Sequence, residues 1–175
     1  MDMLGVKELI IRPAAGEEKP DLSLPPPQLC MALAEAKARE AAAEAGADDA
    51  VIAADTIVVH RGRVYGKPHS AAEAADMLRA LSADTHEVYT GVCVIRSGRV
   101  LCRSDRSAVT FRALSEGEIA RYIQSGEPMD KAGAYGAQGK GALFVERIDG
   151  DFFNAMGLPL CLLGKMLKEQ GVELL

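Results

Sequence analysis

The fold is organised around the stretch Val51-Ile52-Ala53-Ala54-Asp55-Thr56-Ile57-Val58-Val59, which has a single acid among aliphatic and β-branched residues. Such a run, bounded by turn residues, predicts a buried strand. Because burying an ionised carboxylate costs several kcal/mol unless it is paired or bound to a metal, Asp55 needs a partner. Lys67, in the corner Gly66-Lys67-Pro68, supplies a cation soon afterwards. The alternative is an edge-strand Asp in water at a strand break.

Composition limits the class of protein. At 175 residues, with 49% hydrophobic and 26% charged residues, the chain predicts one globular domain with a full core. Its net charge of −5 disfavours a broad nucleic-acid surface, whereas a few local lysines suffice for a small phosphorylated ligand. No apolar run is long enough for a membrane span, the start lacks the features of a signal peptide, and the cysteines show no C-x-x-C spacing. We therefore expect free thiols and a cytoplasmic location.

The region before Asp55 predicts a strand and a long helix. Residues 1–6 resemble the end of a helix that stops at Gly5, and residues 9–11 predict a short strand. Residues 13–28 predict a loop in which Pro25-Pro26-Pro27 favours extended backbone. Residues 28–45 are rich in helix formers, with Leu29, Leu33, Ala36 and Ala43 at helical spacing. Lys37 lies midway along this helix, where a solvent-facing side chain is the simpler interpretation.

The region after Asp55 alternates strand and helix patterns. Hairpin turns are expected at residues 61–63 and 97–98, and strands at 88–95, 100–103 and 107–111 form an antiparallel meander. Helices are expected over 71–81, capped by Ser70, and over 115–125, with Ser115 and Glu118 in a capping box. A strand over 142–148 and a helix from 160 to 170 complete the chain. The pattern predicts an α/β fold with a mixed twisted sheet flanked by helices.

A glycine-dense stretch, residues 129–141, carries no regular periodicity. Glycines at this density let the backbone approach a ligand closely, and the Gln138 amide could read the edge of a nucleobase. The stretch fits neither the phosphate loop G-x-x-x-x-G-K-[ST] nor G-x-G-x-x-G. The alternative is a flexible surface turn.

The candidate functional residues share one chemistry. Two acids suit a hard divalent cation, two lysines suit a polyphosphate, and an acid near the cation could activate water for attack on phosphorus. This combination suggests a phosphoanhydride hydrolase. The members of the set are Glu18, Lys37, Asp55, Lys67 and Gln138. The pair Glu17-Glu18 has a simpler interpretation as a solvated loop.

Several runs resemble the Maf family of nucleoside triphosphate pyrophosphatases, also called septum-formation inhibitors. The resemblance spans roughly residues 4 to 170, and its most specific part is the order of Ala-Asp-Thr and Asp-Lys-Ala-Gly-Ala-Tyr. The matching runs are Leu33-Ala34-x-x-Lys37-Ala38, Ala54-Asp55-Thr56-x-Val58, Gly66-Lys67-Pro68, His86-x-Val88-Tyr89-Thr90-Gly91-Val92, Glu127-Pro128-x-Asp130-Lys131-Ala132-Gly133-Ala134-Tyr135, Gln138-Gly139 and Gly157-Leu158-Pro159-Leu160.

The resemblance implies a fold like that of inosine triphosphatases, with a central cleft, in a homodimer. It implies hydrolysis of a nucleoside triphosphate to the monophosphate and pyrophosphate with Mg²⁺ or Mn²⁺. Carried over by motif, Asp55 is the general base and approaches the metal, as does Glu18. Lys37 and Lys67 contact phosphates, while Thr56 and Gln138 set specificity. The Ala-Tyr-x-x-Gln-Gly context is similar to that of the dTTP/UTP branch.

The sequence departs from the family pattern at its start. Family members begin with a strand and a Ser-x-Ser-Pro-Arg-Arg loop, which would precede Leu4-Gly5-Val6. We expect a single Maf-like domain over 1–175 that lacks these parts and is weakly active, because lost phosphate contacts remove transition-state stabilisation. The alternative is a non-catalytic nucleotide-binding or division-regulating protein. A nucleic-acid-binding regulator is disfavoured by the acidic charge.

Overall fold

The computed structural model describes residues 6, 9–13 and 20–174. None of the helices in this part has the length and hydrophobicity to span a lipid bilayer. The elements follow in the order α1 (Pro26–Ala42), β1 (Val51–His60), β2 (Arg63–Tyr65), α2 (Ala71–Leu81), β3 (Thr85–Arg96), β4 (Arg99–Phe111), α3 (Glu116–Gln124), the 3-10 helices η2 (Glu127–Asp130), η3 (Ala132–Ala134) and η4 (Lys140–Phe144), β5 (Val145–Asp149), α4 (Phe152–Ala155) and α5 (Leu160–Glu169).

The strands form one five-stranded sheet in the order β2-β1-β3-β4-β5. All four pairings are antiparallel, so the α/β class is confirmed, but the sheet of the described residues is antiparallel instead of mixed. The reason is that tight hairpins reverse the chain between β1 and β2 and between β3 and β4, while α2 carries the chain from β2 to the other side of β1, where β3 also runs opposite to β1. Since β2 pairs only with Val58–His60, no described strand pairs with the outer edge of β1 over residues 51–57.

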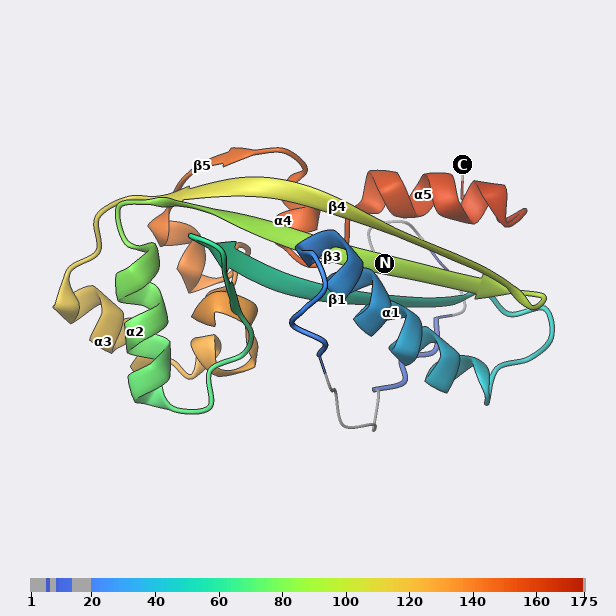
Figure 1. The fold of residues 1–175 in the computed structure, drawn as a ribbon, viewed down its shortest axis with the longest axis horizontal. Helices are drawn as coiled ribbons and strands as arrows, with labels where there is room; N and C mark the ends of the chain where they lie inside the picture. The colour runs from blue at the N-terminus through green and yellow to red at the C-terminus, as the bar shows by residue number, and fades with distance from the viewer. Residues whose placement is uncertain (1–5, 7–8, 14–19, 175) are drawn as a thin grey trace.

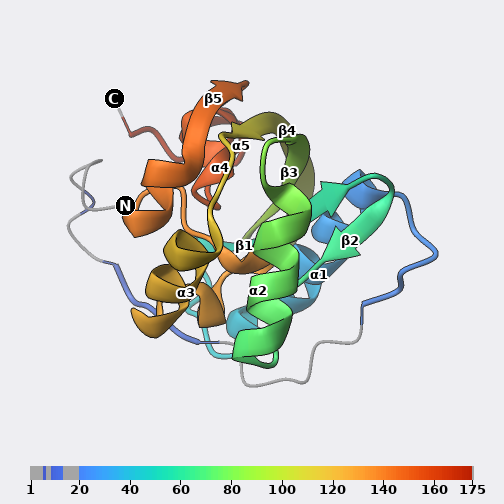
Figure 2. The same ribbon diagram turned by 90° about the vertical axis from the view of Figure 1, so that its left-hand side faces the viewer.

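Helices cover both faces of the sheet (Figure 1). Helix α1 lies on one face and packs Leu29 and Cys30 against Ile57 and Val59 of β1. Helix α5 lies on the other face, over Val92 and Val94 of β3. Figure 2 looks at the molecule from the end where α2 and α3 pack, above the largest hydrophobic cluster, which includes Leu78, Phe111, Ile119 and Tyr122.

Helix α1 approaches β3 closely because the strand has a glycine at the crossing point. A Cβ at Gly91 would overlap the backbone carbonyl of Cys30, so only glycine permits this packing. The buried face of α1 is Leu29, Cys30, Ala34 and Ala38, a different face from the one expected, since Ala36 is exposed. Small residues face the sheet because the close approach leaves no room for larger ones.

Several local predictions are confirmed. Helix α2 spans residues 71–81 as expected, and the Ser70 hydroxyl caps it by accepting from the Glu73 N–H. Helix α3 starts with the expected capping box between Ser115 and Glu118. The strands expected at 100–103 and 107–111 are one continuous strand, β4.

Other predictions are wrong, each for a physical reason. Residues 9–11 form no strand, since they do not pair with any strand of the sheet, and their side chains are exposed. The proline run begins α1 instead of an extended segment, since the missing N–H of Pro26 needs no partner in the first turn. Residues 140–144 form a 3-10 helix before β5, and α4 was not expected. The predicted helix end at 1–5 lies outside the described residues.

Candidate active site

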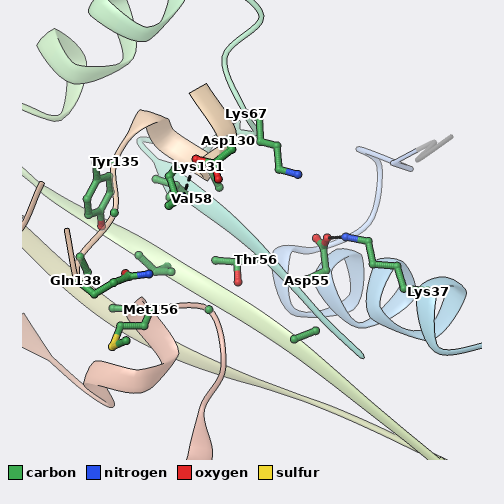
Figure 3. A pocket seen from close by; sticks show the side chains of 17 residues that line it. Lys37, Asp55, Thr56, Val58, Lys67, Asp130, Lys131, Tyr135, Gln138 and Met156 are labelled. Carbon is green, nitrogen blue, oxygen red and sulfur yellow. Dashed lines mark hydrogen bonds and ion pairs between the residues drawn. The ribbon is translucent and has the colours of Figure 1, made fainter. Parts of the chain in front are cut away.

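A pocket of about 220 Å³ lies beside β1. It is bounded by β1, α1 at Lys37, the segment between β2 and α2, the glycine-dense stretch, and the turn after α4 (Figure 3). Its polar side chains are Lys37, Asp55, Thr56, Lys67, Asp130, Lys131, Tyr135 and Gln138. The lysines outnumber the aspartates, so the pocket suits an anion.

At one end of the pocket, the Lys37 ammonium donates a hydrogen bond to the Asp55 carboxylate. The Asp55 side chain is 9% exposed and that of Lys37 is 21% exposed, so water screens this ion pair poorly. Asp55 lies within β1, opposite Gly91 of β3, and not at a strand break. The close approach of α1 at Gly91 thus also brings Lys37, about two turns further along α1, to Asp55.

Lys67 reaches the pocket from the loop after β2, and its side chain points toward the same space (Figure 3). The loop is fixed because the Gly66 carbonyl accepts a 3.0 Å hydrogen bond from the Gly133 N–H. Gly133 has a φ of 66° and lies against Val58, where a Cβ would come within 2.9 Å of a methyl carbon. Position 133 therefore requires glycine, and the hydrogen bond from Gly133 holds the Lys67 loop against the glycine-dense stretch.

Asp130 and Lys131 form an ion pair of 2.6 Å along the same side of the pocket. The hydrogen bond from Lys131, together with the positive charge of Lys67, lowers the pKa of Asp130 despite its partial desolvation. The carboxylate is therefore ionised at neutral pH and restrains the Lys131 ammonium.

The Thr56 hydroxyl is oriented by a buried network. It lies 2.9 Å from the Thr90 hydroxyl, which donates its only proton to the Asn154 carbonyl at 3.0 Å. Thr90 can therefore only accept from Thr56, so Thr56 presents acceptor lone pairs to the pocket. The Asn154 side chain donates to the Val88 carbonyl and the Ser107 hydroxyl, which fixes α4 against β3 and β4.

The opposite end of the pocket is formed by Tyr135, Gln138 and Met156 (Figure 3). The Tyr135 ring is buried against Phe111, and its hydroxyl lies 2.7 Å from His86 Nε2. Gln138 is exposed and projects from the glycine-dense stretch. This end combines an aromatic ring and a methionine with an amide, a lining that suits a nucleobase.

The structure brings five of the six candidate residues, Lys37, Asp55, Thr56, Lys67 and Gln138, to one pocket. Glu18 lies outside the described residues. Sequence reasoning missed the pocket roles of Lys131, Tyr135 and Met156, and the contact of Thr90 with Thr56. The run Asp130-Lys131-Ala-Gly-Ala-Tyr was a usable signal for the first two, because its glycine density already predicted close approach to a ligand.

The described pocket residues could hold a divalent cation only with additional ligands from substrate phosphates and water. Among the described residues, no cluster of three His, Cys, Asp or Glu side chains could enclose an ion. Mg²⁺, however, is commonly held by one or two carboxylates together with substrate phosphates and water. Asp55, beside two lysines that suit phosphate, meets that requirement.

Comparison with known proteins agrees with the geometry. The family model described as Maf-like protein matches residues 1–170. A dTTP/UTP pyrophosphatase of Moorella thermoacetica is 51% identical over 166 residues, which covers 93% of this chain and 84% of that protein. Proteins of the same name from Bacillus cereus (strain AH187) and Bacillus anthracis are each 47% identical over 148 residues, 85% of this chain and 77% of theirs. The match to the family model and these sequence identities show that the chain belongs to the Maf-like protein family.

Proposed function

We propose that this chain is a nucleoside triphosphate pyrophosphatase that hydrolyses dTTP and UTP to the monophosphate and pyrophosphate. The observation that carries the proposal is the division of one pocket into two ends. Lys37, Asp55 and Lys67 lie where a triphosphate would bind, and Gln138 lies beside the apolar end. The dTTP/UTP pyrophosphatases named above, at 47–51% identity, support the choice of substrate.

In the proposed reaction, Asp55 is the general base. Its carboxylate takes a proton from a water molecule as the water oxygen attacks the α-phosphorus. The bond between the α-phosphorus and the oxygen bridging to the β-phosphorus breaks, and pyrophosphate leaves. The Lys37 ammonium stabilises the negative charge of Asp55 before the attack, and with Lys67 it binds the phosphate oxygens. Because an ammonium has three N–H donors, Lys37 can contact Asp55 and a phosphate together.

The pocket lysines and aspartates leave a small positive excess, which is less than the negative charge of a triphosphate. A Mg²⁺ or Mn²⁺ ion would supply the remaining charge neutralisation. Asp55 would hold it directly, and Glu18 is proposed as a second acid. Thr56, as an acceptor, and Gln138, as an amide, would set the specificity for the nucleoside.

We further propose one domain over the whole chain, acting as a homodimer in the cytoplasm. The four cysteines are free thiols, which suits a reducing compartment. Light scattering in solution tests the dimer: a mass of twice the 18.6 kDa chain is expected, and the mass of one chain would contradict it.

The reaction is tested with dTTP and Mg²⁺ in ¹⁸O-labelled water. We expect pyrophosphate and dTMP, with the label in dTMP, because the water attacks the α-phosphorus. UTP should react similarly and dGTP slowly. Orthophosphate and dTDP as products, or the label in pyrophosphate, would contradict the proposed attack. Tight dTTP binding without any product would favour a non-catalytic nucleotide-binding protein.

A further inference from the structure

Glu127, at the start of η2, contacts the backbone of the loop Gly136–Gly141, here called the glycine loop. Its Oε1 accepts from the Gly141 N–H at 3.2 Å, and its Oε2 accepts from the Lys140 N–H at 3.0 Å. Gln138 lies between the two ends of this loop. The carboxylate therefore holds the loop that presents the proposed base-reading side chain, although Glu127 itself is not among the pocket residues.

Tyr122 of α3 completes the contact from the other side. Its hydroxyl donates to Glu127 Oε1 at 2.9 Å and accepts from the Gly136 N–H at 3.1 Å. The ring is buried edge-on against Phe144, with 4.8 Å between ring centroids, so the hydroxyl has a fixed position. Glu127 and Tyr122 thus bind three N–H groups of the glycine loop, one at its start and two at its end.

The glycines of the loop are required by this arrangement. A Cβ at Gly139 would overlap the Glu127 carboxylate, and a Cβ at Gly141 would lie 2.7 Å from both the Tyr122 hydroxyl and the Gly136 carbonyl. The glycine density therefore serves close packing around a carboxylate. The packing explains the high glycine content of the loop, so a flexible surface turn is not needed to account for it.

Glu127 is ionised in this setting. Partial burial opposes its charge, but the hydrogen bonds from Lys140, Gly141 and Tyr122 and the charge of Lys131 outweigh it and lower the pKa. A carboxylate has only acceptor sites, and here each contact is with a donor. An amide at the same place would turn a donor toward one of these N–H groups.

We propose that Glu127 is a positioning residue, which fixes the glycine loop and so sets the selectivity of the pocket for the nucleobase. The proposal rests on the proposed function, since it assumes that Gln138 contacts the base. It assigns no contact between Glu127 and the substrate. The triphosphate end, with Lys37 and Lys67, should be unaffected by changes at Glu127.

Three chemically different variants test this. Glu127→Gln places a donor against an N–H, Tyr122→Phe removes one hydroxyl, and Gly139→Ala displaces the carboxylate. In each, the ratio of kcat/KM for dTTP to that for dCTP should fall, by about tenfold in Glu127→Gln. The change should appear in KM for dTTP more than in kcat. Inhibition by tripolyphosphate, which probes only the triphosphate end, should be unchanged.

The matched control is Glu116→Gln on α3, an exposed carboxylate that pairs with Arg79 and should not alter the ratio. Combining Glu127→Gln with Tyr122→Phe should have less than the sum of the two effects, because both act on one contact. A merely structural role predicts equal losses for dTTP, dCTP and tripolyphosphate, in proportion to a lower Tm. That result, or an unchanged ratio in folded Glu127→Gln, would overturn the proposal.

A binding measurement separates this proposal from the proposed function. Calorimetry with dTMP and dCMP needs no turnover, so it works even if the chain hydrolyses nothing. Loss of the preference for dTMP in Glu127→Gln would support the positioning role whether or not pyrophosphate is released. An equal preference in wild type and variant would overturn it.

Discussion

Replacing Lys37 with methionine should destabilise the protein, because it removes a cation that pairs with the buried Asp55 carboxylate. The Asp55 carboxylate is 9% exposed and accepts a hydrogen bond from the Lys37 ammonium. Methionine keeps the length and packing of the lysine stem, so the change isolates the charge. It also removes a proposed phosphate contact, so activity should fall as well.

The magnitude follows from the exposure of the two partners. Breaking a fully buried ion pair by removing one member costs roughly 3–5 kcal/mol. The Lys37 side chain is 21% exposed and the pocket admits water, so we expect a smaller loss of about 2 kcal/mol. For a domain of this size, that corresponds to a decrease in Tm of about 4–8 °C. Urea unfolding at pH 7 and thermal unfolding both measure it.

The charge argument is checked by adding Asp55→Asn. Because the double variant Lys37→Met/Asp55→Asn removes both charges of this pair, it should recover most of the lost stability. Its activity should not recover, since the proposed base is gone. If the double variant is as unstable as the sum of the two single variants, the loss comes from packing and the reasoning about a buried pair is refuted.

Three further predictions follow from other contacts. Gly91→Ala should cost about 1–3 kcal/mol and lower activity, because α1 must move away from β3, whereas Gly164→Ala, whose Cβ meets nothing, should leave both intact. Thr90→Val should lower kcat/KM for dTTP by freeing the Thr56 proton, whereas Thr110→Val in the exposed Thr85–Thr110 pair should not; equal effects would contradict the role of the network. Burial and the charge of His60 lower the pKa of His86 to about 4, so the folded state binds fewer protons than the unfolded state. Its contribution is complete above pH 6.5 and should be lost as pH falls toward 4, which urea unfolding between pH 7 and 5 measures against a flatter profile in His86→Phe.

The sequence predicted the elements whose signals are local. Helix α2 and the capping box of α3 depend on residues within one turn of each other, and both were located closely. The direction of the strands was predicted less well, because the mixed sheet was inferred from alternating patterns that do not fix pairing. The buried face of α1 was missed since it depends on Gly91, which is distant in sequence from α1.

In the candidate site, too, the sequence predicted what depends on local signals and missed what depends on long-range packing. A lone acid in an apolar strand predicted that Asp55 needs a cation, and the structure places Lys37 against it. The sequence favoured a solvent-facing Lys37, because the sequence cannot show that α1 crosses β1 there. The contacts of Thr90 and Glu127 were unpredictable for the same reason. Each depends on a long-range approach between segments, which no local pattern encodes.

The most direct test of the central claim compares pyrophosphate release from dTTP and Mg²⁺ by wild type, Asp55→Asn and Asp105→Asn. Asp105 lies on β4, outside the pocket, and serves as the control. With Asp55 as general base, Asp55→Asn should lower kcat by about 10²–10⁴-fold while Asp105→Asn matches wild type. A folded Asp55→Asn protein that releases pyrophosphate as fast as wild type would contradict the account.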